Sequence, residues 1–241
     1  MAEGRRVAVT GAASGIGAAT ARLLIERGWR VACLDRDIEG ARKVAGDKGV
    51  AIQVDVADED SVIKAFAEAG SLWDGLDGLV TAAGVIETVP MMETTPAQFR
   101  RLFDINVIGS FLSVREGAKQ MQPGARICMV ASISSYTGGG YVATGAYAAS
   151  KGAVLNLMKG CARSLGEQGI AVNAVAPGFI DTPFVASAMN DPERRKKVEA
   201  NLSGKVGKAE QIAHAIAYMV SEEADFVHGS TLIADGGVLY Q

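Results

Sequence analysis

Tyr147 and Lys151 are the two residues whose types and spacing most directly indicate chemistry. They stand four positions apart where a segment with helical spacing begins, so a helix would place both on one face. A free phenol has a pKa of about 10, and lowering it to about 7 to 8 requires about 3–4 kcal/mol. An ammonium group about 4 Å away supplies roughly that amount at an effective dielectric of about 20. We therefore expect a proton-transfer pair in which Lys151 lowers the pKa of Tyr147.

A glycine-rich turn, Thr10-Gly-Ala-Ala-Ser-Gly-Ile-Gly17, lies between a short apolar run and a helical pattern. Gly11 permits a tight exit from a strand, Gly15 lets the backbone approach a pyrophosphate, and Gly17 lets a helix pack closely. The following helix N-terminus offers unpaired N–H groups and a positive dipole end to phosphates. The spacing differs from the usual G-x-G-x-x-G, and such turns also serve structure alone. Its place after the first strand favours a dinucleotide site.

Asp35 ends the next apolar run, 18 residues after Gly17. A carboxylate there can accept hydrogen bonds from the adenosine ribose hydroxyls and repels a 2′-phosphate, which predicts NAD rather than NADP. Two alternatives stay open. The neighbouring Arg36 could bind that phosphate, and Asp35 could instead cap the helix that follows.

Seven short apolar runs supply the strands that must position these groups. They cover residues 6–10, 30–35, 50–55, 76–81, 126–131, 170–175 and 230–234. Helical spacing is clear over residues 18–27 and 153–165. Strands alternating with helices predict an α/β fold: a doubly wound parallel sheet of about seven strands with helices on both faces. No linker or repeat divides residues 1–241, which predicts a single domain.

Composition and charge narrow the functional class. The 24 Lys and Arg residues against 27 Asp and Glu give a formal net charge of −3, which argues against nucleic-acid and membrane-surface binding. The uncharged stretch 127–150 contains four glycines and many hydroxyl residues, so it is not predicted to span a membrane. No signal-like apolar segment precedes Val7, which predicts a cytoplasmic location.

Cysteines and histidines give no metal site. Cys33, Cys128 and Cys161 form no CxxC pair and lie in apolar stretches, so we interpret them as buried thiols in a reducing compartment. His214 and His228 have no partner at ligand spacing.

From about Val7 to Gly237 the chain resembles the short-chain dehydrogenase/reductase family. The turn, the acidic residue and the Tyr-x3-Lys pair recur in the family's order. Further markers are Asp55-Val56, Ala82-Ala83-Gly84, Asn106, Pro177-Gly178, residues 204–213 and Asp235-Gly236-Gly237. The joint order is specific, although no single marker is. The resemblance implies a Rossmann-type oxidoreductase that moves a hydride between NAD(H) and a secondary alcohol or ketone.

The resemblance also implies roles for single residues. Tyr147 would be the general acid/base, and Lys151 would lower its pKa and hold the nicotinamide ribose. A serine would polarise the reacting oxygen, and Asn106 would support a water that relays protons to Lys151. Without the resemblance, Asn106 would be interpreted as a helix-kink or capping residue.

The implied cofactor contacts include Asp55 and Val56 at the adenine. Pro177, Gly178 and Ile180 would border the nicotinamide, and Thr182 would reach its carboxamide or a phosphate. The full set is Gly11, Ser14, Gly15, Ile16, Gly17, Asp35, Asp55, Val56, Ala82, Ala83, Gly84, Tyr147, Lys151, Pro177, Gly178, Ile180 and Thr182.

The catalytic serine has two candidates. The family's usual spacing, 13 residues before the tyrosine, points to Ser134, whereas a strand over residues 127–131 delivers Ser132 to the carboxyl edge of the sheet. Loops absorb insertions more readily than buried strands do, so we predict Ser132 and keep Ser134 as the alternative.

Thr81 is a second departure from the family, which usually has an asparagine there. That asparagine braces the central strand near the cofactor. Threonine offers fewer hydrogen bonds, so we expect a weaker brace.

The substrate is expected beyond the carboxyl ends of the strands. Expected lining residues are Val85, Ile86, Met91, Tyr136, Tyr141, Phe179 and Phe184, and residues 184–205 would cover the substrate. We interpret the charged run 193–197 as a solvated helix face. Mostly apolar walls predict a small hydrophobic alcohol or ketone.

Two other functions stay open, an NADP-dependent 3-oxoacyl reductase and a non-catalytic NAD-binding regulator. The resemblance also suggests a homotetramer.

Overall fold

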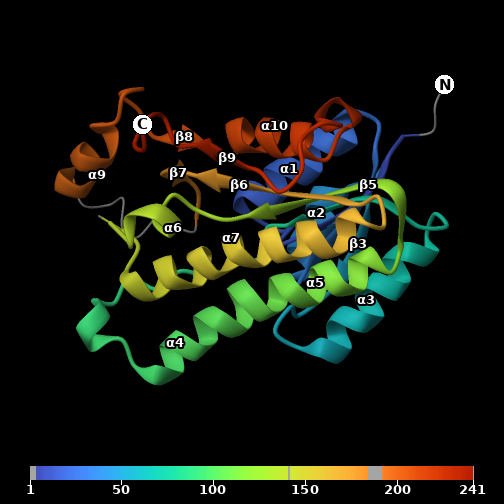
Figure 1. The fold of residues 1–241 in the computed structure, drawn as a ribbon, viewed down its shortest axis with the longest axis horizontal. Coiled ribbons are helices and arrows are strands. Elements are labelled where there is room, and N and C mark those ends of the chain that lie inside the picture. Colours follow the sequence, from blue (N-terminus) through green and yellow to red (C-terminus); the bar gives the residue numbers. More distant parts are fainter. Residues whose placement is uncertain (1–3, 141, 184–191, 241) are drawn as a thin grey trace.

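The computed structural model describes residues 4–140, 142–183 and 192–240. Seven strands form one parallel sheet between two layers of helices (Figure 1). In the order β3-β2-β1-β4-β5-β6-β9, they are β3 Val50–Gln53, β2 Arg30–Asp35, β1 Arg6–Thr10, β4 Leu76–Thr81, β5 Met121–Val130, β6 Ala171–Pro177 and β9 Thr231–Ala234. The predicted doubly wound, Rossmann-type sheet is confirmed.

Two strand boundaries differ from the prediction. β3 stops at Gln53, so Asp55 lies beyond its carboxyl end rather than within the strand. β5 begins five residues early, at Met121, which pairs with Leu76 before the register shifts. The polar sequence Gln122-Pro-Gly hides this irregular start, because it lacks the apolar signal of a buried strand.

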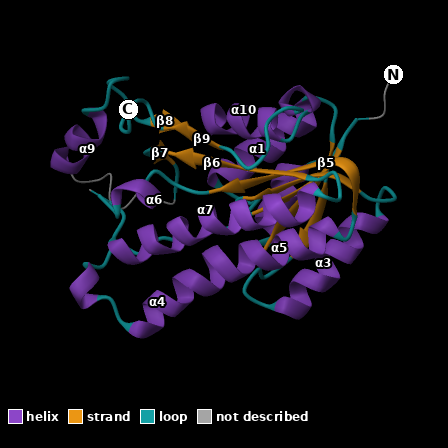
Figure 2. Ribbon diagram, viewed as in Figure 1, coloured by secondary structure: helices purple, strands orange, loops and turns teal. Residues whose placement is uncertain are grey.

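Helices cover both faces of the sheet, as Figure 2 shows. The helices that pack on one face are α1 Gly15–Glu26, α2 Ile38–Ala45 and α10 Ala209–Met219. Those on the other are α3 Glu59–Ser71, α5 Gly109–Ala118 and α7 Gly145–Gly166. In β1, Val7 and Val9 join the first helical layer while Ala8 joins the second. Burial on both faces explains why the strands are continuous apolar runs.

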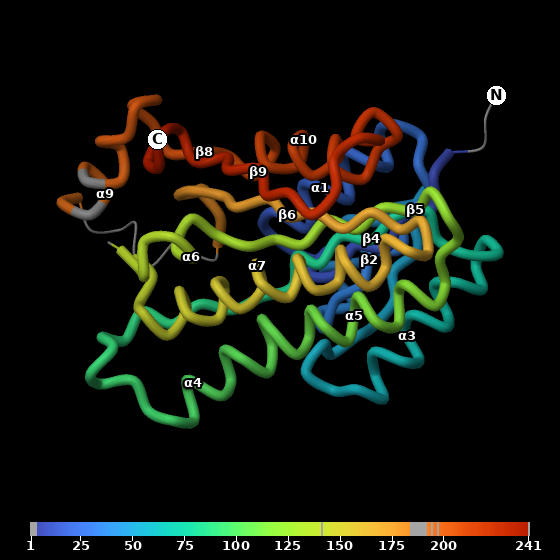
Figure 3. Tube along the Cα trace, in the orientation of Figure 1, coloured from blue at the N-terminus to red at the C-terminus, as the bar shows by residue number. Residues whose placement is uncertain are grey.

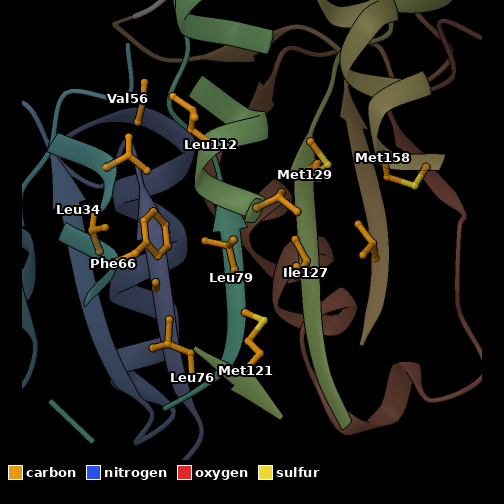
Figure 4. Packing of buried hydrophobic residues seen from close by; sticks show 14 of the residues in the cluster. Leu34, Val56, Phe66, Leu76, Leu79, Leu112, Met121, Ile127, Met129 and Met158 are labelled. Carbon is orange, nitrogen blue, oxygen red and sulfur yellow. The ribbon is translucent and has the colours of Figure 1, made fainter. Parts of the chain in front are cut away.

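The larger core cluster lies between the sheet and the α3–α5–α7 layer. Phe66 of α3 is fully buried and lies among Leu34 of β2, Leu79 of β4 and neighbouring aliphatic side chains (Figure 4). Met129 of β5 and Met158 of α7 extend this core to the helix that carries Tyr147. The packing fixes α7 against the sheet and thereby the position of Tyr147.

Short elements gather at one end of the molecule, at left in Figure 3. They are the helices α4 Pro96–Phe103, α6 Ser134–Thr137 and α9 Pro192–Glu199, the strands β7 Ile180–Asp181 and β8 Gly207–Lys208, and the 3-10 turn Met91–Glu93. β7 and β8 pair with each other in parallel. A π-helical turn, Asp104–Ile108, joins α4 to α5. A second 3-10 turn, Glu222–Ala224, follows α10.

The cysteines agree with the prediction in part. Cys33 and Cys128 are buried in β2 and β5, and burial raises the pKa of each thiol to about 12. Cys161 on α7 is only half-buried, because one side of that helix is open to solvent. None of the described helices combines the length and apolarity that crossing a membrane requires.

Thr81 ends the central strand β4 with its hydroxyl unpaired. The side chain is buried, and its Oγ1 has no hydrogen-bond partner among the described residues. By contrast, Thr10 Oγ1 at the end of β1 accepts a hydrogen bond of 3.3 Å from the Ala83 amide. The structure therefore agrees with the expectation that Thr81 makes fewer stabilising hydrogen bonds than an asparagine would.

We predict that Thr81→Val raises the free energy of unfolding by about 1 kcal/mol, because it replaces an unpaired buried hydroxyl by a methyl group of similar size. Thr10→Val is the matched control and should lower it by about 1 kcal/mol, since the Ala83 amide loses its acceptor. Urea unfolding at constant m-value measures both. A destabilised Thr81→Val variant would contradict the unpaired hydroxyl.

Candidate active site

A cleft of about 340 Å³ opens at the carboxyl edge of the sheet, where the loops after β1, β2, β4, β5 and β6 meet. Ligands of doubly wound sheets bind at this edge. Every residue expected to contact the cofactor lines the cleft, as do Ser132 and Ser134. Asn106 does not line it and lies directly behind.

The glycine-rich turn forms the floor at one end of the cleft. Gly11 has φ +69°, and a Cβ built on it would lie 2.7 Å from the Ala83 backbone, so only glycine fits. Ser14 stands at the N-cap of α1 but makes no side-chain cap bond, and the first turn contains no acidic residue. The N–H groups and positive dipole end of α1 therefore remain available for phosphate, which fits a dinucleotide.

Thr182 faces this same turn from the other side of the cleft. A Cβ built on Gly15 would lie 3.6 Å from Thr182 Cγ2. The Thr182 hydroxyl donates to the Ile180 carbonyl at 3.3 Å. Of the two contacts expected for Thr182, the phosphate is the one that this placement favours.

Asp35 closes the turn at the end of β2. Its Oδ2 accepts from the Ala13 amide and its Oδ1 from the Asp37 amide, both at 2.9 Å. Asp37, not Asp35, caps α2, because its carboxylate accepts from the Gly40 amide. The capping alternative for Asp35 is therefore wrong. The carboxylate keeps lone pairs for ribose hydroxyls, while the exposed Arg36 forms no ion pair within the described residues.

Tyr147, Lys151 and Ser132 meet at the middle of the cleft. Tyr147 and Lys151 occupy the first turns of α7 and are both buried. The Tyr147 hydroxyl is hydrogen-bonded to the Ser132 side chain. Lys151 Nζ donates to the Val130 carbonyl at 2.8 Å and lies 6.0 Å from the centre of the Tyr147 ring.

The pKa of Tyr147 moves in the opposite direction from the one expected. Burial raises the pKa of the phenol above its ordinary value, and the hydrogen bond to Ser132 offsets this only in part. Lys151 does not offset this effect, and burial lowers the pKa of Lys151 itself to about 8. The prediction that Lys151 lowers the pKa of Tyr147 is wrong for the protein alone.

The hydrogen bonds of Ser132 and Ser134 distinguish the two candidates for the catalytic serine. Ser132 is the residue bonded to Tyr147, and its Oγ also accepts from the Ser134 amide at 3.1 Å. Ser134 begins the short helix α6. The strand register that predicted Ser132 thus agrees with the contact to the phenol.

Asn106 is fully buried in the π-helical turn between α4 and α5. Its Oδ1 accepts from the Val85 amide at 2.8 Å, and its Nδ2 donates to the Val85 carbonyl and to Ser150 Oγ, both at 3.0 Å. Asn106 therefore lies at an irregular helical turn, as expected without the resemblance. It also lies close to the site, as the resemblance implies. The widened turn lets one amide clamp the chain that follows β4.

The substrate end matches the prediction incompletely. Val85, Ile86 and Phe179 line the cleft, whereas Met91 and Tyr136 are exposed outside it. Tyr141, Phe184 and residues 184–191 of the expected covering segment lie outside the described residues. The charged run falls on α9, where Arg195 pairs with Glu199 at 3.0 Å on an exposed face, as a solvated helix would.

Sequence reasoning missed several apolar lining residues. They are Val54, Ile105, Val130, Ala131, Ile133, Val142 and Ala143. Val54, Val130 and Ala131 carried a usable signal, since they lie at or next to the ends of the predicted runs 50–55 and 126–131. Val142 and Ala143 follow three glycines, and nothing local marks them as buried.

Fold and site together define a nicotinamide-dependent oxidoreductase of the doubly wound class, and the comparisons with known proteins agree. Residues 11–239 match the family model described as enoyl-(acyl carrier protein) reductase. The chain belongs to the short-chain dehydrogenase/reductase family.

Two relatives of known activity align over nearly the whole chain. Cis-4-hydroxycyclohexanecarboxylate dehydrogenase of Sinomonas cyclohexanicum is 39% identical, over 97% of this chain and 96% of its own. 2-(R)-hydroxypropyl-CoM dehydrogenase of Xanthobacter autotrophicus is 38% identical, over 95% and 96%.

Solved structures agree in fold. A short-chain dehydrogenase/reductase of the glucose/ribitol dehydrogenase type from Brucella melitensis has a TM-score of 0.92 at 30% identity, covering 99% of each chain. A short-chain dehydrogenase from Burkholderia cenocepacia, solved with NADP, has a TM-score of 0.90 at 30% identity, covering 98% of each.

We predict that Lys151 makes stability depend on pH. The folded chain releases the Lys151 proton near pH 8, whereas the unfolded chain holds it to about its ordinary pKa of 10.5. The unfolded state therefore binds more protons in this window, and raising the pH favours folding by up to about 1.4 kcal/mol per pH unit.

Urea unfolding of the wild type and Lys151→Met from pH 7 to 10.5 tests this. Above pH 8, the unfolding free energy of the wild type should rise relative to that of Lys151→Met. Lys159→Met, at an exposed position of the same helix, is the control and should follow the wild-type curve. A difference that is constant with pH would disprove the lowered pKa.

Proposed function

We propose that this protein transfers a hydride between NAD(H) and a small secondary alcohol or ketone. The observation that carries the proposal is the buried Tyr147 hydroxyl, bonded to Ser132 in a cleft whose other end is a dinucleotide turn. A phenol placed there can exchange a proton with a substrate oxygen held by the serine.

The catalytic roles follow from the contacts of each side chain. In alcohol oxidation, Tyr147 in its ionised phenolate form would take the substrate hydroxyl proton at its phenolic oxygen while Ser132 holds the reacting oxygen. Lys151 donates one N–H to the Val130 carbonyl, and its other two N–H groups can bind the ribose of the nicotinamide. When bound, the nicotinamide supplies the hydride acceptor and a positive charge that favours the phenolate.

NAD is proposed over NADP because Asp35 is fixed at the ribose end of the cleft by two backbone amides. A 2′-phosphate would meet this carboxylate at close range. The exposed guanidinium of Arg36, which lines the cleft, is the feature that favours the alternative, an NADP-dependent 3-oxoacyl reductase. Relative activity with the two cofactors distinguishes these.

The substrate is proposed to be neutral and hydrophobic. Within the described lining the cationic side chains are Arg36, at the ribose end, and Lys151. Val85, Ile86, Val142, Ala143 and Phe179 are apolar and border the reacting end. The names of both relatives imply oxidation of a secondary alcohol, which supports that reaction class.

Three further expectations stand as part of this proposal. Residues 1–241 act as one domain, residues 184–205 cover the substrate, and the chain assembles as a homotetramer. The rival from another class, a non-catalytic NAD-binding regulator, would bind NADH but turn over no alcohol or ketone.

We predict that a panel of cyclic and linear secondary alcohols, followed at 340 nm, contains substrates of the wild type. Tyr147→Phe should abolish turnover, because phenylalanine cannot exchange a proton. Ser132→Ala should lower kcat at least about tenfold, since the reacting oxygen loses its donor. Ser134→Ala, the matched control, should stay within about threefold. Full activity of Ser132→Ala, or of Tyr147→Phe, would overturn the assigned roles.

We also predict that Asp35→Ala raises the KM for NAD about tenfold or more and lowers the KM for NADP, because the variant loses the ribose acceptor and the charge that repels the 2′-phosphate. Asp37→Ala is the control, as it removes the α2 cap but not the ribose contact. Steady-state kinetics with both cofactors measure the change. An unchanged ratio of the two kcat/KM values in Asp35→Ala would exclude Asp35 as the selector.

A further inference from the structure

Ser150 is a buried hydroxyl that joins two parts of the site. It is fully buried on α7, between Tyr147 and Lys151 in the chain. Its Oγ lies 2.7 Å from the Tyr147 carbonyl and 3.0 Å from Asn106 Nδ2. The second contact spans 44 residues of sequence.

The hydrogen atoms of these contacts can be assigned without ambiguity. A carbonyl only accepts, so the single Ser150 proton goes to Tyr147 O. Ser150 Oγ must then accept from Asn106, which requires the Asn106 NH₂ group to point at the serine. The Val85 amide, a donor, independently requires Asn106 Oδ1 on the other side.

The orientation of this amide determines what faces Lys151. A Cβ built on Gly84 would lie 3.2 Å from Asn106 Oδ1 and 3.6 Å from Lys151 Nζ. The amide oxygen and the ammonium therefore border the same point beside the chain that follows β4. If the amide turned over, an NH₂ group would face the ammonium instead of an oxygen acceptor.

We propose that Ser150 is a positioning residue for proton transfer, acting through Asn106. It fixes the Asn106 amide, whose oxygen lies near the same point beside Gly84 as Lys151 Nζ, and ties the π-helical turn to α7. This inference rests on the proposed dehydrogenase function. Ser150 is not a catalytic residue, because it does not line the cleft.

A second buried serine, Ser113, makes only the local bond to a carbonyl of its own helix that is usual for serine, and so differs from Ser150. Ser113 on α5 is also buried, and its hydroxyl donates to the Gly109 carbonyl at 2.7 Å. No hydrogen bond from a distant side chain reaches Ser113 within the described residues. Ser113→Ala thus removes the same kind of local bond without touching Asn106, and serves as the matched control.

The test compares Ser150→Ala with Ser113→Ala in the full-length enzyme. We expect Ser150→Ala to lower kcat about tenfold, to leave the KM for NAD within about twofold, and to shift the pH midpoint of kcat by about half a pH unit or more. Ser113→Ala should keep the wild-type kcat and pH midpoint. If Ser150→Ala does not fold, Ser150→Cys retains the volume but offers a weak acceptor, and should show the same changes to a smaller degree.

A double-mutant cycle separates positioning from general support of the fold. In an Asn106→Ala background, Ser150→Ala should lower kcat by less than about twofold further, because its effect passes through Asn106. Fully additive losses, or a wild-type kcat and pH profile in Ser150→Ala, would overturn the inference. Failure of the proposed dehydrogenase function would give a different result from failure of the Ser150 inference. In that case the wild type would be inactive, or Tyr147→Phe would be active.

Discussion

The site depends on one buried interaction with the sheet, the hydrogen bond from Lys151 Nζ to the Val130 carbonyl. Val130 is the last residue of β5, and Lys151 lies in the second turn of α7, so this bond fixes the start of α7 at the carboxyl edge. Burial lowers the Lys151 pKa to about 8 and raises the pKa of Tyr147. The phenol is therefore neutral in the protein alone, and a positive charge entering the cleft would favour its ionised form.

Polar groups near the carboxyl edge differ in how well they are satisfied. Among the described residues, the buried Thr81 hydroxyl has no hydrogen-bond partner, whereas Lys151 Nζ is bound to the Val130 carbonyl. Asn106, behind the same edge, uses both ends of its amide, as does Asn173 in β6, which donates to Val227 and accepts from Ser230. Unpaired buried atoms are not confined to this edge, since Arg5 Nε and Arg126 Nε also have no partner among the described residues.

The sequence predicted the fold well, and the residues expected at the cofactor line one cleft, because both depend on local patterns. Continuous apolar runs mark strands buried on both faces, and Gly11 is required by a positive φ that can be anticipated from the turn. The sign of the Tyr147 shift could not be anticipated, since helical spacing gives proximity but not desolvation. Ser150 was equally hidden: its local bond to Tyr147 O is common in helices, and only the tertiary structure brings Asn106 to it.

The Ser132–Ser134 question shows how tertiary geometry corrects a spacing rule. Counting back 13 residues from Tyr147 assumes a fixed length between strand and helix, yet α6 and three glycines occupy that interval. The strand end is the better reference, because β5 is pinned by pairing to β4 and β6 whereas the loop is not. Ala131 and Ile133 still bond to the end of β6, through Val175 and Pro177 carbonyls. This extension carries the pairing three residues past β5, to Ile133, and places Ser132 at the Tyr147 hydroxyl before the loop begins.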